Sequence, residues 1–348
     1  MHMADALISP VVGGTMWIAA SGVTAYSIKK VQNELEDSKV PLMGVMGAFV
    51  FASQMINFSI PGTGSSGHIG GGMLLAALLG PYAGFLTMAS ILIIQALFFA
   101  DGGLIALGCN IFNLGFYTCF LAYPLIYKNL IKNRFSTKQI LKASLISSII
   151  GLQLGAFSVV VQTLLSGKTE LPFTTFLLLM QPIHLGIGIV EGLVTATVLS
   201  FLWKARPELF GHCYGEKRNL PLKKIIVYLS ISAVLIGGVL SWFASSNPDG
   251  LEWSTTKASG KEELEVSGSI HEKAEAIQEG IAILPDYGFK KVKVQEGENS
   301  EQWPSINAGT SVSGIVGGIM TLVLAIGASK GIAIYKNRKT MNNKENFS

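Results

Sequence analysis

Two histidines near the start of the chain have the chemistry of a metal site: His2 and, in a glycine-rich segment, His68. A histidine in second position can supply three nitrogens: the Met1 amine, its own amide nitrogen and its Nδ1, which close a five-membered and a six-membered ring. These donors favour a plane, and His68 completes a square of four nitrogens. Square-planar nitrogen sites select Ni(II) or Cu(II) rather than zinc, magnesium or calcium. The alternative is that His2 is a surface histidine with no ligand.

Other ionisable residues in or beside apolar stretches are functional candidates because their burial is costly. His184 and Glu191 are seven residues apart, on about the same face of a helix. They form either a structural pair that bridges packed helices or part of a transport path. Asp101 precedes two glycines and is predicted to cap a helix or turn. Hydrogen-bonding residues expected around the metal site are Asp5, Gln95, Asn110 and Asn113.

The composition indicates that these residues are positioned by membrane helices. Apolar residues make up 49% of the 348-residue chain, charged residues only 14%, and the mean hydropathy is +0.47. Such values exclude a disordered chain, a nucleic-acid-binding module and a disulfide-stapled secreted domain. The three cysteines, Cys109, Cys119 and Cys213, have no metal-type or redox-type spacing. We therefore predict an all-α polytopic membrane protein.

The apolar stretches and the basic connectors between them set the predicted topology. Apolar stretches lie near 6–28, 42–60, 73–127, 143–165, 173–203, 225–244 and 311–335. Lys and Arg concentrate in 29–41, 128–142, 204–224 and the tail after Tyr335, whereas 61–72 has none. The positive-inside rule places these basic segments in the cytoplasm, the N-terminus outside and the C-terminus inside. The first residues carry no basic stretch, so a signal peptide is not expected.

Segment 73–127 must cross the membrane an odd number of times, and its length favours three crossings. The expected breaks are Gly80-Pro81 and Asp101-Gly102-Gly103. The first helix would then run from about His68 to Leu79 and span roughly 18 Å, too short for a hydrocarbon core of about 30 Å. The loop before it must dip into the membrane, where irregular backbone survives only inside protein or along a cavity. The sequence thus predicts nine spans, with a site at this loop.

These spans divide the chain into a metal-binding membrane domain at 1–205, a cytoplasmic basic linker at 206–224, and a second domain at 225–340. The second domain has two spans around an extracytoplasmic loop, 245–310. This loop holds twelve acidic residues and six lysines, a net charge of −6. That charge could attract cations, but the composition favours a small solvated domain.

Two short motifs suggest nucleotide binding and are rejected. Segment 62–67 matches GxGxxG, but that fingerprint requires a βαβ unit, and here membrane helices flank it. Segment 166–169 resembles the end of a phosphate-binding loop, but Gln162 stands where the first glycine belongs. The chain also lacks a zinc-protease motif and a serine-nucleophile elbow. We therefore do not expect an enzyme.

Three motifs resemble the CbiM/NikM family: Met1-His2-Met3-Ala4-Asp5-Ala6-Leu7-Ile8-Ser9-Pro10, Gly67-His68-Ile69-Gly70-Gly71-Gly72, and Gln95-Ala96-Leu97-Phe98-Phe99-Ala100-Asp101-Gly102-Gly103. This resemblance covers about 1–205. The later part, with Pro248-Asp249-Gly250-Leu251-Glu252 after a span, is similar to the NikN/CbiN-type partner subunit, so the chain looks like a natural fusion of the two.

The resemblance implies the substrate-binding S component of an energy-coupling factor transporter, with a seven-helix core and two further helices. It implies metal ligands at Met1, His2 and His68, in agreement with the chelation argument. It also implies partners: a transmembrane coupling subunit and cytoplasmic ATPases. The planar nitrogen square favours nickel, with cobalt as the alternative. A different class remains open, a self-sufficient cation channel or secondary transporter in the cell membrane.

Overall fold

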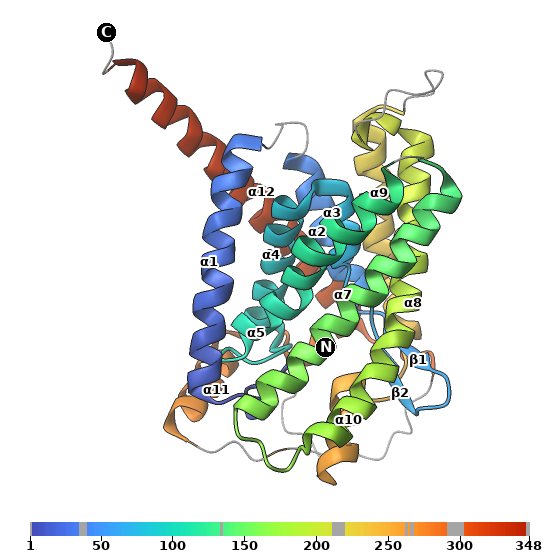
Figure 1. Cartoon of the computed structure of the whole chain (residues 1–348), viewed down its shortest axis with the longest axis vertical. Helices are drawn as coiled ribbons and strands as arrows, with labels where there is room; N and C mark the ends of the chain where they lie inside the picture. Colours follow the sequence, from blue (N-terminus) through green and yellow to red (C-terminus); the bar gives the residue numbers. More distant parts are fainter. Residues whose placement is uncertain are drawn as a thin grey trace.

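The computed structural model describes residues 2–34, 40–132, 135–210, 220–261, 264, 268–290 and 303–345. Its helices are α1 (Pro10–Glu34), α2 (Val40–Gln54), α3 (Gly72–Leu79), α4 (Pro81–Phe99), α5 (Leu107–Ile111), a π-helix (Phe112–Tyr127), α6 (Lys128–Ile131), α7 (Thr137–Leu165), α8 (Phe173–Ala205), α9 (Leu222–Gly238), α10 (Gly250–Ser259), α11 (Ser269–Ile281) and α12 (Ala308–Glu345). Short 3-10 turns cover Asp5–Leu7, Pro207–Phe210, Leu240–Phe243 and Pro285–Tyr287. Helices α5, π and α6 run on continuously from one to the next (Figure 1).

The prediction of an all-α polytopic membrane protein is confirmed. Six helices are long and apolar enough to cross a membrane, and α2 is a shorter apolar helix among the described residues. The six spans are Pro10–Gln32, Pro81–Phe99, Leu107–Ile131, Thr137–Leu165, Phe173–Ala205 and Ala308–Ile332. Helices α3 and α9 occupy two further stretches for which spans were predicted. The number of crossings, nine, stays a prediction.

Helix α3 lies at the predicted position and has both predicted breaks after it. It contains 8 residues, and Gly80 ends it with a φ of 87° before Pro81 opens α4. Helix α4 ends at Phe99, and Ala100 takes the left-handed conformation. The predicted start at His68 was wrong, because Gly71 has a φ of 79° and breaks the helical path, so α3 begins at Gly72.

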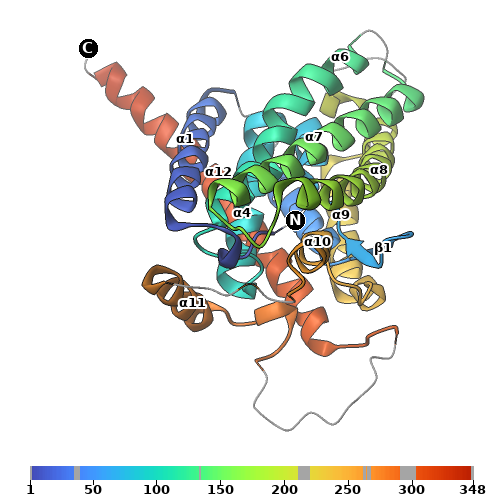
Figure 2. The ribbon, with the colours of Figure 1, turned by 60° about the horizontal axis from the view of Figure 1, so that its bottom comes forward.

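The loop before α3 contains the structure's small antiparallel sheet, β1 (Phe58–Ile60) and β2 (Ser65–Gly67). Phe58 pairs with Gly67, so the strand register ends directly before His68. This sheet lies at the same end of the molecule as α10 and α11, whereas α12 runs away toward the opposite end (Figures 1 and 2). The fold thus gathers segments from both halves of the sequence at one end.

Close helix packing depends on glycine at two interfaces. Helix α8 lies against α7, where a Cβ on Gly192 would be 2.6 Å from Leu145 Cα. Helices α9 and α12 meet at Gly237 and Gly314, where the Cβ of a larger residue at Gly237 would lie 3.1 Å from Gly314 Cα. Both α9 and α12 also pack on α2. The C-terminal helices are therefore attached to the N-terminal bundle through small-residue contacts typical of membrane helices.

Candidate metal-binding site

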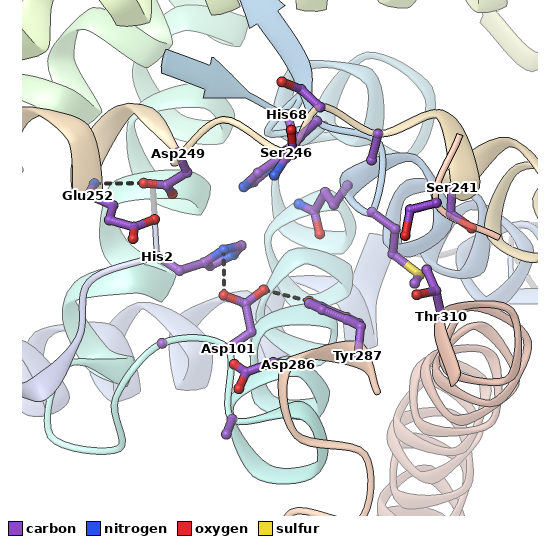
Figure 3. Close-up of a pocket in the computed structure, with 18 residues that line it drawn as sticks. His2, His68, Asp101, Ser241, Ser246, Asp249, Glu252, Asp286, Tyr287 and Thr310 are labelled. Atoms are coloured by element: carbon purple, nitrogen blue, oxygen red, sulfur yellow. Dashed lines mark hydrogen bonds and ion pairs between the residues drawn. The ribbon is translucent and has the colours of Figure 1, made fainter. Parts of the chain in front are cut away.

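The structure brings His2 and His68 together. Their rings are stacked, with centroids 5.1 Å apart and planes inclined by 14°. Both side chains line a cavity of about 500 Å³ at the end of the bundle that carries β1 and β2 (Figure 3). Met1 lies outside the described residues, so its predicted role as a ligand stays a prediction. The two predicted histidine ligands thus reach one point from segments 66 residues apart in the chain.

The segment around His2 is fixed by its neighbour Met3. The Asn110 side chain accepts a hydrogen bond from the Met3 backbone N–H at 2.8 Å and donates one to the Met3 carbonyl at 3.1 Å. The Gly103 N–H also donates to the Met3 carbonyl, at 2.9 Å. Asn113 Nδ2 lies 3.6 Å from Met3 Sδ. Both asparagines therefore act on the residue next to His2, where hydrogen bonds can orient a ligand.

Asp5 and Gln95, the other two predicted hydrogen-bonding residues, lie one step further from the histidines. Asp5 Oδ1 accepts from the Ala106 N–H at 2.9 Å and so ties the N-terminal segment to the turn before α5. Gln95 Nε2 donates to Gln54 Oε1 at 2.8 Å, and Gln54 Nε2 donates to the Gly70 carbonyl at 2.8 Å. Gln95 thus reaches the His68 loop through Gln54. Whether any of these residues tunes a metal stays a prediction.

The His68 ring is oriented by its own loop. Its Nδ1 is 3.0 Å from the Ile69 carbonyl oxygen, which can only accept, so Nδ1 carries the proton and Nε2 is the nitrogen with a lone pair. Removal from bulk water is the largest of the influences that lower the pKa of His68 to about 3. The imidazole is therefore neutral at physiological pH, the form that binds metals.

Asp101 belongs to the site, and the prediction that it caps a helix or turn was wrong. Its Oδ1 lies 3.1 Å from His2 Nδ1, and its Oδ2 accepts a hydrogen bond from the Tyr287 hydroxyl (Figure 3). Burial raises the pKa of Asp101, but the His2 charge and the hydrogen bonds from His2 and Tyr287 hold it well below its usual range. The signal in the sequence was an acid directly after a span; its Gly-Gly neighbours led to the capping interpretation.

Some of the described residues of the acidic segment 245–310 line the cavity, so the prediction of a small solvated domain was wrong for this part of it. Asp249 and Glu252 from the start of α10, with Asp286 and Tyr287 from the turn Pro285–Tyr287, line the same cavity as the histidines. Polar residues that complete the lining include Ser241, Ser245, Ser246, Ser305 and Thr310. Three carboxylates that composition alone placed in solvent therefore line the same cavity as the histidine pair.

Further hydrogen bonds attach α11 and the residues after it to the N-terminal segment and to the loop after α4. Gln278 of α11 donates to the Ala96 and Gly102 carbonyls at 2.8 and 2.7 Å. His271 Nε2 is 2.9 Å from the Ile8 carbonyl. The backbone N–H groups of Ile283 and Leu284 both donate to the Phe98 carbonyl at 3.1 Å. The C-terminal half thus contacts the N-terminal segment and the end of α4.

The Pro248-Asp249-Gly250-Leu251-Glu252 motif docks beside β2. The Ser66 N–H donates to the Pro248 carbonyl at 2.8 Å. The backbones of Ser66 and Asp249 form an isolated parallel β-bridge. The Asp249 carboxylate caps α10 by accepting from the Glu252 N–H at 2.7 Å. Burial raises the pKa of Asp249, but nearby positive charge and that N–H bring it below the ordinary value. The motif therefore places an ionised carboxylate beside the histidines.

His184 and Glu191, the predicted helix-bridging pair, have different partners. His184 Nδ1 is 2.8 Å from the Met180 carbonyl one turn earlier in α8. Glu191 Oε2 accepts instead from the Gly70 N–H, two residues after His68.

Of the cysteines, Cys109 and Cys119 are buried, and Cys213 lies outside the described residues. In the part of the chain that the structure describes, no three His, Cys, Asp or Glu side chains are grouped as a metal site.

Comparisons with known proteins match both halves of the chain. Residues 2–209 match the CbiM family model, described as a cobalt uptake substrate-specific transmembrane region, and residues 223–333 match the PDGLE domain. A protein of Archaeoglobus fulgidus named a fused nickel transport protein NikMN is 32% identical over 95% of this chain and 98% of its own length. A cobalt transport protein CbiM of Sorangium cellulosum is 28% identical over 60% and 94%. A crystal structure of a transition metal transporter is 30% identical, with a TM-score of 0.53 over 62% of this chain and 98% of its own.

Proposed function

We propose, from the premise that this chain belongs to the CbiM family and carries a PDGLE domain behind it, that the protein takes up Ni(II) as its transported substrate. The observation that carries the proposal is the stacked pair of His2 and His68 in a cavity lined by carboxylates. Relatives named for nickel and for cobalt transport support uptake of a transition metal. Cobalt is the alternative substrate.

The proposed ligands are the Met1 amine, the His2 amide nitrogen and Nδ1, and His68 Nε2. Two features support this set. The hydrogen bonds from Asn110 and Gly103 to Met3 fix the backbone next to His2, and the His68 tautomer leaves Nε2 as the donor atom. His2 Nδ1 faces Asp101 at 3.1 Å, so the metal must replace Asp101 as the partner of that nitrogen.

Nickel is preferred because a deprotonated amide with three further nitrogens in a plane gives the strongest field to a d⁸ ion. Nitrogen donors of this geometry also bind copper, which stands above nickel in affinity. Selection against copper would therefore come from metal availability. Direct titration should rank nickel before cobalt, with zinc weak and magnesium or calcium undetectable.

Transport requires partners, and we propose a transmembrane coupling subunit with cytoplasmic ATPases. The absence of a complete phosphate-binding loop in the sequence supports this division of labour. We place the N-terminus and the loop 245–310 outside the cell membrane and the C-terminus inside. The arrangement of α11 and the far end of α12 at opposite ends of the bundle supports this orientation (Figure 1). The PDGLE domain then assists metal loading from outside.

The decisive experiment is metal analysis of the detergent-purified protein with an unmodified N-terminus, followed by uptake assays in vesicles. We expect one tightly held nickel ion per chain and uptake that needs the ATPase subunits and ATP. A preparation that loads no nickel and no cobalt would contradict the proposal. Uphill uptake by this chain alone, insensitive to ATP, would instead favour a secondary transporter.

A further inference from the structure

Glu191 is a buried acidic residue within α8 that the proposed ligand set does not use. Its side chain is fully buried (0% exposed), and its Oε2 accepts a hydrogen bond from the Gly70 N–H at 2.8 Å. Its Oε1 lies 3.5 Å from the Met73 N–H, in the first turn of α3. In the described residues Glu191 thus faces backbone N–H groups of the His68 loop and of the first turn of α3. An acid inside a membrane helix is costly, so its placement calls for a role.

Glu191 is the last of three α8 residues that pack, one after another along the helix, on segments around the cavity. Ile183, Ile187 and Glu191 follow each other at intervals of four residues, so they share one face of the helix. Each one faces a glycine at which an added Cβ would be in close contact with it. Ile183 faces Gly250 of the PDGLE motif, Ile187 faces Gly67 of β2, and Glu191 Oε2 would lie 3.1 Å from a Cβ on Gly70.

The Gly70 peptide unit is held from two sides. Glu191 accepts from its N–H, while Gln54 of α2 donates to its carbonyl oxygen at 2.8 Å. Because Gly70 is only two residues after His68, a shift of this peptide moves the imidazole. Gly71 has a φ of 79°, so the helical conformation of α3 does not extend back into this loop. The position of the His68 ring therefore depends on partners supplied by α2 and α8.

We infer that Glu191 is a positioning residue for the metal ligand His68: its carboxyl group holds the Gly70 and Met73 N–H groups and so places His68 opposite His2. The inference rests on the proposed function, since it assigns Glu191 to the metal site. It also makes α8 the helix that aligns the PDGLE motif, β2 and the His68 loop along one face. A displacement of α8 would then move the fourth ligand away from the other three.

The test is a comparison of Glu191→Gln with Glu191→Met in the full chain with a free N-terminus. Loss of an outer hydrogen-bond partner of a metal ligand typically costs about 10- to 100-fold in affinity. We expect Glu191→Gln to lose nickel affinity near the lower end of this range, since one oxygen acceptor remains, and Glu191→Met to lose it near the upper end. If Glu191→Met fails to fold, the glutamine variant, which keeps the shape of the side chain, decides the question.

A double-mutant cycle separates positioning from general stability. With His68→Ala in the background, Glu191→Gln should cause no additional loss of nickel affinity, because the residue that it positions is already absent. The visible spectrum of Ni(II) in Glu191→Gln should shift from that of four nitrogens toward that of three, as in His68→Ala. The matched control is Gln153→Leu, which removes a 2.8 Å hydrogen bond from α7 to the Gln181 carbonyl of α8 that involves no residue of the His68 loop. It should leave the four-nitrogen spectrum unchanged.

Hydrogen exchange of the metal-free protein provides a measurement that does not depend on nickel. Peptides covering 67–73 should exchange faster in Glu191→Gln than in the wild type and should be unchanged in Gln153→Leu. Additive losses in the double variant, or unchanged exchange of this loop, would overturn the inference while leaving nickel binding in place. A wild-type protein that binds neither nickel nor cobalt would overturn the proposed function itself.

Discussion

The two walls of the cavity differ in chemistry. The wall built by the N-terminal half presents the nitrogens of His2 and His68 with the single carboxylate of Asp101, whereas the wall built by the C-terminal half presents oxygens, including those of Asp249, Glu252 and Asp286. Nitrogen donors in a plane discriminate among transition metals, and carboxylate oxygens attract divalent cations of many kinds. With the proposed ligand set, the difference teaches that metal selection and cation attraction fall to separate parts of one chain.

The two walls also differ in how they are held. The nitrogen wall is fixed by hydrogen bonds to backbone groups beside each histidine, from Asn110 at Met3 and from Gln54 and Glu191 at Gly70. The oxygen wall is attached through the PDGLE motif at Ser66 and through Tyr287 at Asp101. Changes to the first should alter affinity, and changes to the second should alter the rate of loading.

The largest expected effect comes from a change to the first atom of the chain. An N-terminal tag or acetyl group removes the Met1 amine as a donor, so tight nickel binding should disappear in calorimetry. The same tag on the C-terminus is the control and should have no effect. Unchanged nickel affinity in a folded, N-terminally extended protein would mean that the nitrogen wall is built from side chains alone.

The next effect is that of His68→Ala, which removes one donor and keeps the N-terminal chelate. Loss of a residue that only hydrogen-bonds to a metal ligand costs about 10- to 100-fold in affinity. We expect the loss of the ligand His68 itself to cost more. The thermal midpoint should change little, because the ring is hydrogen-bonded only to the neighbouring Ile69 carbonyl of its own loop among the described residues. Stoichiometric tight nickel in this variant would remove His68 from the ligand set.

A smaller effect is expected on the oxygen wall, from Asp249→Asn combined with Glu252→Gln. Asparagine keeps the cap of α10, so the helix should be retained while two charges are lost. Acidic clefts raise association rates of cations by about tenfold or more, and salt screens this attraction. Stopped-flow loading should therefore slow at low ionic strength and approach the wild-type rate at high salt. An altered dissociation rate with normal association would contradict this division between the walls.

The smallest effect concerns the pH dependence of binding. Nickel displaces protons from its ligands, so affinity falls as the pH falls. The pKa of His68 is lowered to about 3 by its removal from water, so this ring is already deprotonated between pH 5 and 8 and releases no proton when nickel binds. The slope of log affinity against pH in that range should be the same in His68→Ala as in the wild type. A shallower slope in the variant would show that His68 is protonated in the free protein.

The pairing of His2 with His68 and the break before α4 could be predicted because their determinants are local. The order of donors at residues 1 and 2 fixes the sizes of the chelate rings, and Gly80-Pro81 fixes the end of a helix too short to span a bilayer. The roles of Asp101 and of segment 245–310 were missed for the opposite reason. Asp101 meets Tyr287, 186 residues later, and no periodicity connects the two.

The sequence by itself determined that this is a helical membrane protein and that its glycine-rich loop interrupts the helices, and it predicted His2 and His68 as metal-type donors. These conclusions follow from hydrophobic length, backbone restrictions and ring size, all of which involve near neighbours. Only the tertiary structure decided which side chains surround the histidines. Glu191 holds Gly70 across 121 residues, and a PDGLE motif of acidic, apparently solvated composition lies against β2. Such contacts exist because helix packing brings distant segments to one end of the bundle, where buried backbone N–H and C=O groups must find partners.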